Sequence, residues 1–241
     1  MPNFSSIIAP KTAKIAVSHS HALGTSDYDM DELYSPDTDQ WRSKVLDIGS
    51  PKYSPNKTYA FDRSRYQNHG TITGAVWKQL PSGIWVLTFD GTDDYINCGD
   101  HAEHVFGTGA FTLEVWVKLT LIDDLFRRII SKSSTVSNDQ YFLRIADFTS
   151  FANRWEFEVY DGVNEATTRL TASIPVVNTW YHVVCVRNGT TIYLYINGVL
   201  DVSATNASLA SIDNSGYPLR IGSYSSTAGA AGEWSKSVIG E

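Results

Sequence analysis

Beyond residue 58 the chain alternates apolar and polar positions in short runs, the period-two pattern typical of strands with one buried face. In the clearest run, Phe111, Leu113, Val115 and Val117 alternate with polar or mixed positions. Gly, Asn, Asp and Pro separate the runs at intervals of about 8–12 residues, which indicates a sandwich or barrel. The predicted strands cover residues 71–77, 85–89, 95–98, 111–119, 128–132, 140–146, 154–160, 167–173, 180–187, 190–196, 199–204 and 219–223.

Two Asn-Gly pairs sharpen this prediction. Asn188-Gly189 lies between the predicted strands 180–187 and 190–196, and Asn197-Gly198 lies between the second of these and 199–204. Asn and Gly tolerate the positive φ angles of a type I′ turn, whose twist matches that of antiparallel strands. We therefore predict three consecutive antiparallel strands joined by two tight hairpins.

Residues 1–58 differ from residues 59–241 in both composition and pattern. They hold five of the eight prolines, and apolar residues are sparse after Ile15-Ala16-Val17. A segment with so few apolar residues cannot bury a core of its own. We predict an extended N-terminal arm over 1–58 that lies on the domain 59–241 or on a partner.

One short helix is predicted within this arm. Ser35-Pro36 supplies a capping side chain and then a proline at the first helical position. Trp41 and Val45-Leu46 fall on one face at helical spacing, and Gly49 can end the helix.

Composition and charge narrow the class of protein. The chain has 241 residues, 42% of them hydrophobic and 19% charged, which fits one large folded domain or two small ones. Thirteen Tyr and seven Trp favour β structure. A net charge of −7 argues against binding to nucleic acid, which needs clustered cations.

No apolar run approaches the roughly 20 residues of a membrane helix, and the start lacks the pattern of a secretory signal. We expect no membrane insertion and synthesis without a signal peptide.

The two cysteines, Cys98 and Cys185, both lie in apolar, strand-like runs. We interpret them as buried small hydrophobic residues. A disulfide that closes the long loop between them is the alternative. Two cysteines alone cannot form a structural zinc site.

Several stretches in fixed order resemble one known family. The sequence Phe-Asp-Arg-Ser-Arg-Tyr-Gln-Asn-His-Gly at 61–70 is followed by Leu-Thr-Phe-Asp-Gly-Thr-Asp-Asp-Tyr-Ile at 87–96. Phe-Thr-Leu-Glu-Val-Trp-Val-Lys at 111–118, Thr-Trp-Tyr-His-Val-Val-Cys-Val-Arg-Asn-Gly at 179–189 and Tyr-Leu-Tyr-Ile-Asn-Gly at 193–198 complete the set. The set resembles the LamG-like jelly-roll domains of the concanavalin A-like lectin/glucanase superfamily over about residues 58–241. The resemblance implies an all-β fold, a two-sheet antiparallel jelly-roll sandwich.

The resemblance also implies something about the end of the chain. Family members continue past a stretch like 232–241 with a final strand that closes a sheet near the first strand of the domain. This sequence ends at Glu241, so we expect the final strand to be missing and one sheet edge to be unpaired. The N-terminal arm could cover that edge, a neighbouring chain could cover it, or the sequence could be truncated. The expected partners are therefore further copies or neighbouring assembly subunits, through the arm and this C-terminal edge.

Catalytic patterns are weak in this sequence. Some glucanases of the superfamily carry paired acids at alternating positions of one strand, and Glu156, Glu158 and Asp161 are the nearest approach. The third acid is out of register, and the alternation of this run is typical of a solvated face. No nucleophile elbow, zinc-binding His-Glu-x-x-His helix or phosphate loop is present. We predict that the protein is not an enzyme and assign no catalytic residue.

Metal binding has two candidate sites. The run from Asp27 has acidic residues at alternating positions, but Glu32 stands where an EF-hand needs Gly, and Thr38 stands where it needs Glu. The resemblance implies a structural Ca²⁺ at Asp62 and Asn68, joined by an acid from the last strand, here Glu241. The alternative is that Asp62 and Asn68 only hold their own turn.

Sugar binding needs exposed aromatic rings beside polar groups, and the sequence offers more rings than a site requires. Because most of them must fill the core, we assign none as a binding residue. The candidates are Trp116, Tyr141, Trp155, Tyr160, Tyr224 and Trp234. His182 shares a strand face with apolar residues and is predicted to be a satisfied, partly buried histidine rather than a ligand or a base.

The favoured hypothesis is a non-catalytic structural or recognition protein with a lectin-like jelly roll. It would belong to a larger assembly on the surface of a virion or another extracellular particle or appendage, in a decoration or adhesion role. The alternative is a soluble carbohydrate-binding module with a glycan as its ligand. A glycoside hydrolase is the third hypothesis, and the missing acid pattern counts against it.

Overall fold

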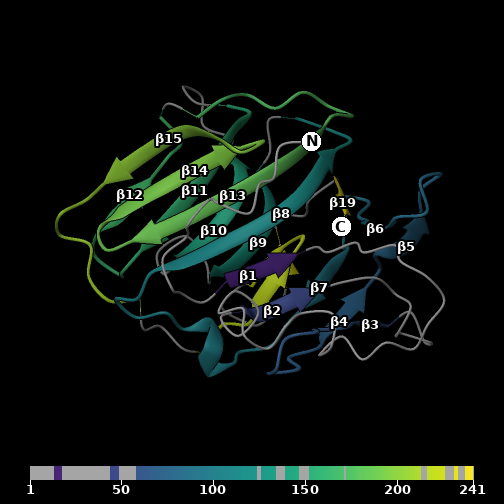
Figure 1. Cartoon of the computed structure of the whole chain (residues 1–241), viewed down its shortest axis with the longest axis horizontal. Helices are drawn as coiled ribbons and strands as arrows, with labels where there is room; N and C mark the ends of the chain where they lie inside the picture. The colour runs from purple at the N-terminus through teal and green to yellow at the C-terminus, as the bar shows by residue number, and fades with distance from the viewer. Residues whose placement is uncertain are drawn as a thin grey trace.

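The chain folds into two packed β-sheets with a small two-stranded sheet beside them (Figure 1). The computed structural model describes residues 14–17, 44–48, 58–123, 126–133, 139–146, 152–170, 172–212, 216–225, 231–232 and 237–240. No helix in these ranges has the length and apolar character needed to span a membrane.

Sheet A holds the two nine-residue strands, the longest described, and follows the order β15-β14-β13-β8-β19-β6-β5. Strands β1 and β2 pair beside this path, β1 with both β8 and β2. The strands of sheet A are β1 (Lys14–Val17), β2 (Lys44–Ile48), β5 (Val76–Gln79), β6 (Trp85–Thr88), β8 (Phe111–Leu119), β13 (Trp180–Asn188), β14 (Thr191–Ile196), β15 (Val199–Thr205) and β19 (Ser237–Gly240).

Sheet B follows the order β12-β11-β10-β9-β16-β7-β4-β3. Its strands are β3 (Tyr59–Ala60), β4 (Gly70–Thr73), β7 (Tyr95–Asn97), β9 (Arg127–Ser133), β10 (Asp139–Ala146), β11 (Arg154–Tyr160), β12 (Glu165–Thr167) and β16 (Leu219–Ile221). The small sheet pairs β17 (Tyr224–Ser225) with β18 (Ala231–Gly232), and a short 3-10 helix, η2 (Ala102–His104), follows β7.

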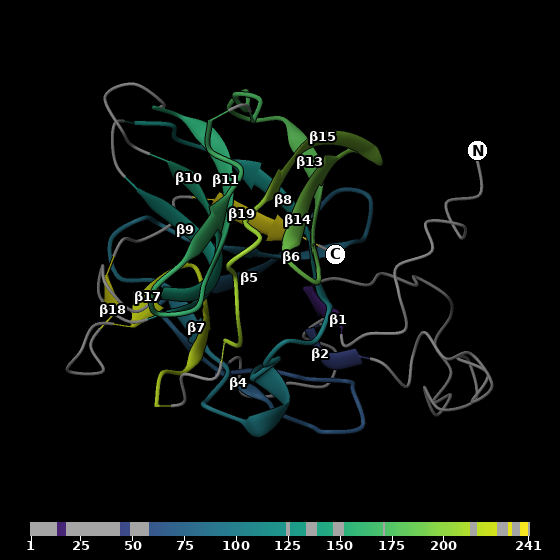
Figure 2. The same ribbon diagram turned by 90° about the vertical axis from the view of Figure 1, so that its left-hand side faces the viewer.

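The two large sheets stack face to face, as Figure 2 shows with β9, β10 and β11 on one side and β13, β14 and β15 on the other. Alternate residues of each strand meet in the layer between them. Phe111 stacks on Phe106 with ring centroids 4.4 Å apart and meets Phe157 of sheet B edge-on at 6.2 Å. Leu113, Val115 and Val117 are fully buried, as the alternation of their strand predicts. The all-β jelly-roll prediction is confirmed.

The predicted hairpins are present, with one difference in the turn. Asn197 and Gly198 both have positive φ angles (53° and 81°) and join β14 to β15, as a type I′ turn requires. In the preceding hairpin Asn188 remains in β13 and pairs with Thr191, so the turn is Gly189-Thr190. Only Gly189 of that turn has a positive φ, of 61°.

Two strand predictions are wrong. The range 71–77 is split into β4 in sheet B and β5 in sheet A, because Gly74 takes a φ of 72° and turns the chain. Of the described residues in 167–173, only Thr167 belongs to a strand, as the end of β12. Thr168 leaves the ladder, and its hydroxyl accepts the backbone N–H of Phe157.

The predicted helix near the end of the arm is also wrong where it is described, because residues 44–48 form strand β2. Leu46 and Ile48 are almost completely buried in the core. A strand brings both of these alternate positions to the same buried face. The rest of the predicted helix lies outside the described residues, and the domain boundary at residue 58 stays a prediction.

The expectation of a missing final strand is wrong as well. Strand β19 pairs antiparallel with β6 and with the C-terminal half of β8, so it closes sheet A between them. Strand β1 pairs in parallel with the N-terminal half of β8, from Lys14 opposite Thr112 to Val17 opposite Val115. The edge of β8 is therefore shared by two short strands from opposite ends of the sequence.

Candidate functional site

The outer face of sheet A carries a row of aromatic side chains. Trp116 projects from the middle of β8 and is 39% exposed. Its indole stacks on the imidazole of His182 on β13, with ring centroids 5.0 Å apart and planes inclined by 25°. The two residues are directly opposite each other in the β8–β13 ladder, which explains the contact.

Charged groups flank this aromatic pair. His182 Nε2 lies 2.9 Å from Glu114 Oε1, two positions before Trp116 on the same face of β8. On the other side, the Lys118 ammonium lies 5.2 Å from the ring centre of Trp180, within cation–π range. Tyr193 and Tyr195 continue the face on β14, with stacked rings 6.5 Å apart. We call the set Glu114, Trp116, Lys118, Trp180, His182, Tyr193 and Tyr195 the aromatic face.

The structure sorts the aromatic candidates of the sequence. Tyr141 and Trp155 are completely buried between the sheets, whereas Tyr160 and Tyr224 are partly buried. Among the candidates that the structure describes, Trp116 is the one that is exposed. Trp234 lies outside the described residues. The interpretation of His182 as a satisfied, partly buried histidine is confirmed, although its partner Glu114 was not foreseen.

The acids of β11 lie on the outer face of sheet B and are buried, contrary to the solvated face that their alternation predicts. Glu156 is completely buried and accepts hydrogen bonds from Arg144 Nε at 2.5 Å, Thr167 Oγ1 at 3.1 Å and Arg169 Nη1 at 3.2 Å. Glu158 pairs with the same Arg169 at 3.5 Å. Arginine side chains therefore occupy the positions around both carboxylates.

Asp161, the third acid of the glucanase comparison, holds a loop. Its carboxylate accepts backbone N–H groups from Val163, Asn164 and Ala210 at 2.8, 2.6 and 2.7 Å. Burial acts to raise the pKa of Asp161, but these hydrogen bonds outweigh it and lower the pKa to about 2. A carboxyl of this kind remains an ionised acceptor.

The Asp62 turn is held by its own hydrogen bonds. Asp62 Oδ1 accepts the backbone N–H groups of Asp47 and Ser64, and Oδ2 accepts the Ser64 hydroxyl and the Asn68 N–H, all at 2.8 Å. Asn68 Nδ2 points to Glu103 Oε2 at 3.5 Å. Four donors fill the carboxylate, so a cation here would have to displace them. The Ca²⁺ site stays a prediction, and its third ligand, Glu241, lies outside the described residues.

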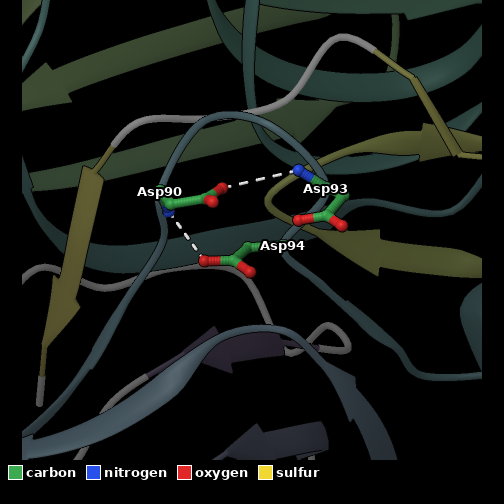
Figure 3. Close-up of side chains that lie close together, drawn as sticks. All are labelled: Asp90, Asp93 and Asp94. Atoms are coloured by element: carbon green, nitrogen blue, oxygen red, sulfur yellow. Dashed lines mark hydrogen bonds between the residues drawn. The ribbon is translucent and has the colours of Figure 1, made fainter.

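A second acidic loop follows β6 (Figure 3). Asp90, Asp93 and Asp94 bring carboxylate oxygens within 4.8 Å of one another, close enough to share a cation. The loop also bonds to itself, since Asp94 Oδ2 accepts Asp90 N–H and Asp90 Oδ1 accepts Thr92 N–H, both at 2.7 Å. Burial and the neighbouring negative charges raise the pKa of Asp94 despite the Asp90 hydrogen bond. The acids of this loop therefore serve as acceptors for its own backbone N–H groups.

Cys98 and Cys185 are completely buried and unpaired, which confirms their interpretation as small hydrophobic residues. Burial raises the pKa of both thiols far above its ordinary value. The acidic run that begins at Asp27 lies outside the described residues.

Solved structures share this fold. The binding domain of Paraclostridial Mosquitocidal Protein 1 matches with a TM-score of 0.57 and 14% identity, over 75% of this chain and 44% of that one. The receptor binding domain of botulinum neurotoxin mosaic serotype C/D matches with a TM-score of 0.53 and 15% identity, over 75% and 42%. The chain thus spans less than half the length of these structures, and identity at this level shows the fold alone. No curated protein sequence matches the chain.

A family-level comparison agrees with the architecture. The sequence model described as Concanavalin A-like lectin/glucanases superfamily matches residues 90–235, more than half of the chain. The matched range begins at the Asp90 loop and includes the whole of β8 and the three consecutive strands β13, β14 and β15. The chain belongs to the concanavalin A-like lectin/glucanase superfamily.

Proposed function

We propose that this protein is a non-catalytic recognition module that binds carbohydrate on the aromatic face of sheet A. The observation that carries the proposal is Trp116, a half-exposed indole beside a carboxylate, an imidazole and an ammonium group. The flat ring offers a surface for the C–H face of a pyranose, and the polar groups can exchange hydrogen bonds with its hydroxyls. The two structures of similar fold are both described as binding domains, which agrees with this role.

The geometry of Trp116 favours binding over a purely structural role. Its rotation is restrained by the His182 stack, and His182 is in turn held by Glu114. A ring that is already fixed loses little side-chain entropy when a ligand stacks on it. The remaining exposed side of the indole is then a prepared contact surface.

The non-catalytic part of the proposal rests on the acids of β11. A glycosidase needs one protonated carboxyl and one carboxylate that both reach the glycosidic bond. Glu156 is completely buried and engaged by Arg144, Arg169 and Thr167, so this carboxyl is committed to ion pairs.

An assembly role is the second part of the proposal. A group of exposed aliphatic side chains supports it, formed by Ile174, Val176, Val177, Val199 and Leu200. Their two segments are tied together, because Ser173 N–H donates to Asp201 Oδ2 at 2.9 Å. Exposed apolar groups of this kind mark interaction surfaces. We infer that neighbouring subunits of a virion or other extracellular particle cover them.

The glycan role is tested with the purified full-length chain on a broad glycan array. We expect selective signals that Trp116→Ala lowers at least tenfold. Tyr59→Ala, which removes another exposed aromatic ring on β3 in sheet B, should leave them unchanged. Circular dichroism checks that both variants are folded. Silence of the wild-type protein across the array, or equal loss in both variants, would overturn the proposal.

The assembly role is tested separately by light scattering after size-exclusion chromatography. The wild-type chain should form oligomers that Val176→Lys and Val199→Lys dissociate. A wild-type chain that stays monomeric at high concentration would refute the assembly role without affecting glycan recognition.

A further inference from the structure

Sheet B contains a lysine that points into the interior of the sandwich. Lys132 on β9 pairs with Tyr141 on one side and Leu219 on the other, and its side chain is completely buried. Its Nζ donates hydrogen bonds to Asp100 Oδ1 at 2.5 Å and to the carbonyl oxygen of Tyr217 at 2.6 Å. Burying an ammonium group is costly, so the arrangement needs a reason.

Asp100 is held in place from the opposite side. It follows β7, which is separated from β9 by β16 in the sheet order. Its Oδ2 accepts the backbone N–H of Gly216 at 2.7 Å while Oδ1 faces Lys132. The Asp100 side chain is 32% exposed, so solvent reaches the carboxyl. The carboxyl is thus oriented with one oxygen toward the amine and the other toward an N–H donor.

A buried imidazole accompanies the pair. His104 in η2 is completely buried, and neither ring nitrogen makes a hydrogen bond of ordinary geometry within the described residues. Burial, then the positive charges of Lys132 and His101, lower the pKa of His104 to about 4, so the ring is neutral at pH 7. Burial also lowers the pKa of Lys132. The first shift keeps the imidazole neutral, and the second favours the neutral, nucleophilic amine of Lys132 over the ammonium, against the opposing effect of the Asp100 hydrogen bond.

We propose that Lys132 and Asp100 join spontaneously in an intramolecular amide, an isopeptide cross-link between β9 and the end of β7. A buried amine held against a carboxyl is in the position for this condensation, because the bimolecular step has become intramolecular. The product removes the buried ammonium charge together with its counter-charge and ties two non-adjacent strands across β16.

The chemistry balances without any co-reactant. A proton first passes from the Lys132 ammonium to Asp100 Oδ1, which gives a neutral amine and a carboxylic acid. The nitrogen lone pair attacks Cγ, and the oxyanion that forms on Oδ2 is stabilised by the Gly216 N–H. Neutral His104 takes a proton from the attacking nitrogen and returns it to Oδ1, which leaves as water. The amide keeps one N–H for the carbonyl of Tyr217.

Intact mass spectrometry of the purified full-length protein tests the cross-link directly. The expected mass is that of the sequence less one water molecule, and a tryptic digest should contain one branched peptide joining Lys132 to Asp100, uncleaved after Lys132. Lys132→Arg and Asp100→Ala should both restore the full mass, whereas Lys78→Arg, on the exposed part of β5, should keep the loss. Asp100→Asn should lose ammonia instead of water.

The result that overturns the proposal is a folded wild-type chain with the full sequence mass and separate Lys132 and Asp100 peptides. This measurement needs no variant, so it stands even where Lys132→Arg fails to fold. His104→Phe tests the proton carrier alone. The lower mass should then appear more slowly after synthesis; an unchanged rate would remove His104 from the mechanism and leave the cross-link itself in place.

Discussion

Replacing Glu156 by Gln is the most direct test of how the outer face of sheet B is stabilised. The carboxylate is completely buried and is the counter-charge of Arg144, whose Nε lies 2.5 Å away. The Arg144 guanidinium also lies over the rings of Phe126 and Phe142, at 4.1 and 4.4 Å from their centres. The substitution keeps the size of residue 156 but removes its charge.

The expected loss of stability follows from what Arg144 would retain. Its side chain is 8% exposed, so water cannot replace the missing carboxylate. Removing one partner of a buried ion pair typically costs about 3–5 kcal/mol, since the other charge stays buried. The two aromatic rings recover a part of this cost, which places the expected loss near the lower limit, about 3 kcal/mol.

Urea denaturation followed by tryptophan fluorescence measures this loss as a shift in the midpoint at constant slope. Glu165→Gln is the matched control, since Glu165 pairs with Arg169 at 2.9 Å, as Glu156 does at 3.2 Å, but its side chain is 46% exposed. An exposed pair contributes about 0–1 kcal/mol, so the control should unfold almost as the wild type does. If the two variants lost equal and small amounts of stability, the carboxylate of Glu156 would not be desolvated, and the argument would fail.

Two further predictions concern backbone strain and pH. Gly74→Ala should lower the unfolding free energy by about 1–3 kcal/mol, because Gly74 has a φ of 72° and a Cβ there would lie 1.9 Å from Asp94 Oδ1. Gly83→Ala is the control, because Gly83 has a φ of 88° but a Cβ there would have no atom within 4 Å, so this substitution should cost less. An equal loss in both variants would leave no role for the clash with Asp94. The unfolding free energy should fall by about 3 kcal/mol as the pH drops from 6.5 to about 4, because the unfolded chain takes up the His104 proton first while burial keeps the folded ring neutral. This difference should disappear in His104→Phe, and a variant with the same pH profile as the wild type would contradict it.

Much of the fold follows from local sequence patterns. The strands Phe111–Leu119 and Arg154–Tyr160 have the predicted bounds, because in both the sequence alternates apolar residues with polar or mixed ones. The Asn197-Gly198 turn forms as predicted, since both residues accept positive φ. These features depend on interactions within a few residues or on one buried face, and a sequence displays both.

The misplaced elements depend on contacts between distant segments. Strand β2 forms because Lys44–Ile48 pairs with β1, and strand β19 forms because Ser237–Gly240 fits between β6 and β8. Each is too short to show a period of its own. No local pattern predicts the contact between Glu114 and His182, because it depends on the register in which β13 pairs with β8.

Charged residues inside the sandwich show a second limit of prediction from sequence patterns. Arg187 faces the interior from β13 and donates hydrogen bonds to the carbonyl oxygens of Gly107 and Ala210, both at 2.7 Å. Lys132 occupies an equivalent inward position on β9. An alternation rule places both residues correctly on the inner face, but it does not supply the partners that make their burial tolerable. The partner that gives Lys132 a chemical role, Asp100, lies 32 positions away in the sequence, and only the fold brings the two side chains together.

The two outer faces of the sandwich explain why we assign recognition to sheet A rather than to sheet B. Both faces mix aromatic and charged residues, so sequence composition does not separate them. On sheet B, Arg144 lies against Phe142 and bonds to Glu156, and all three side chains are buried. Those groups are already matched to one another, and a ligand would have to break that match. On sheet A, Trp116 keeps one side of its ring accessible while His182 fixes the other. A binding surface needs a group that is held in place and still unmatched on one side, and of the two faces the described residues of sheet A meet that condition.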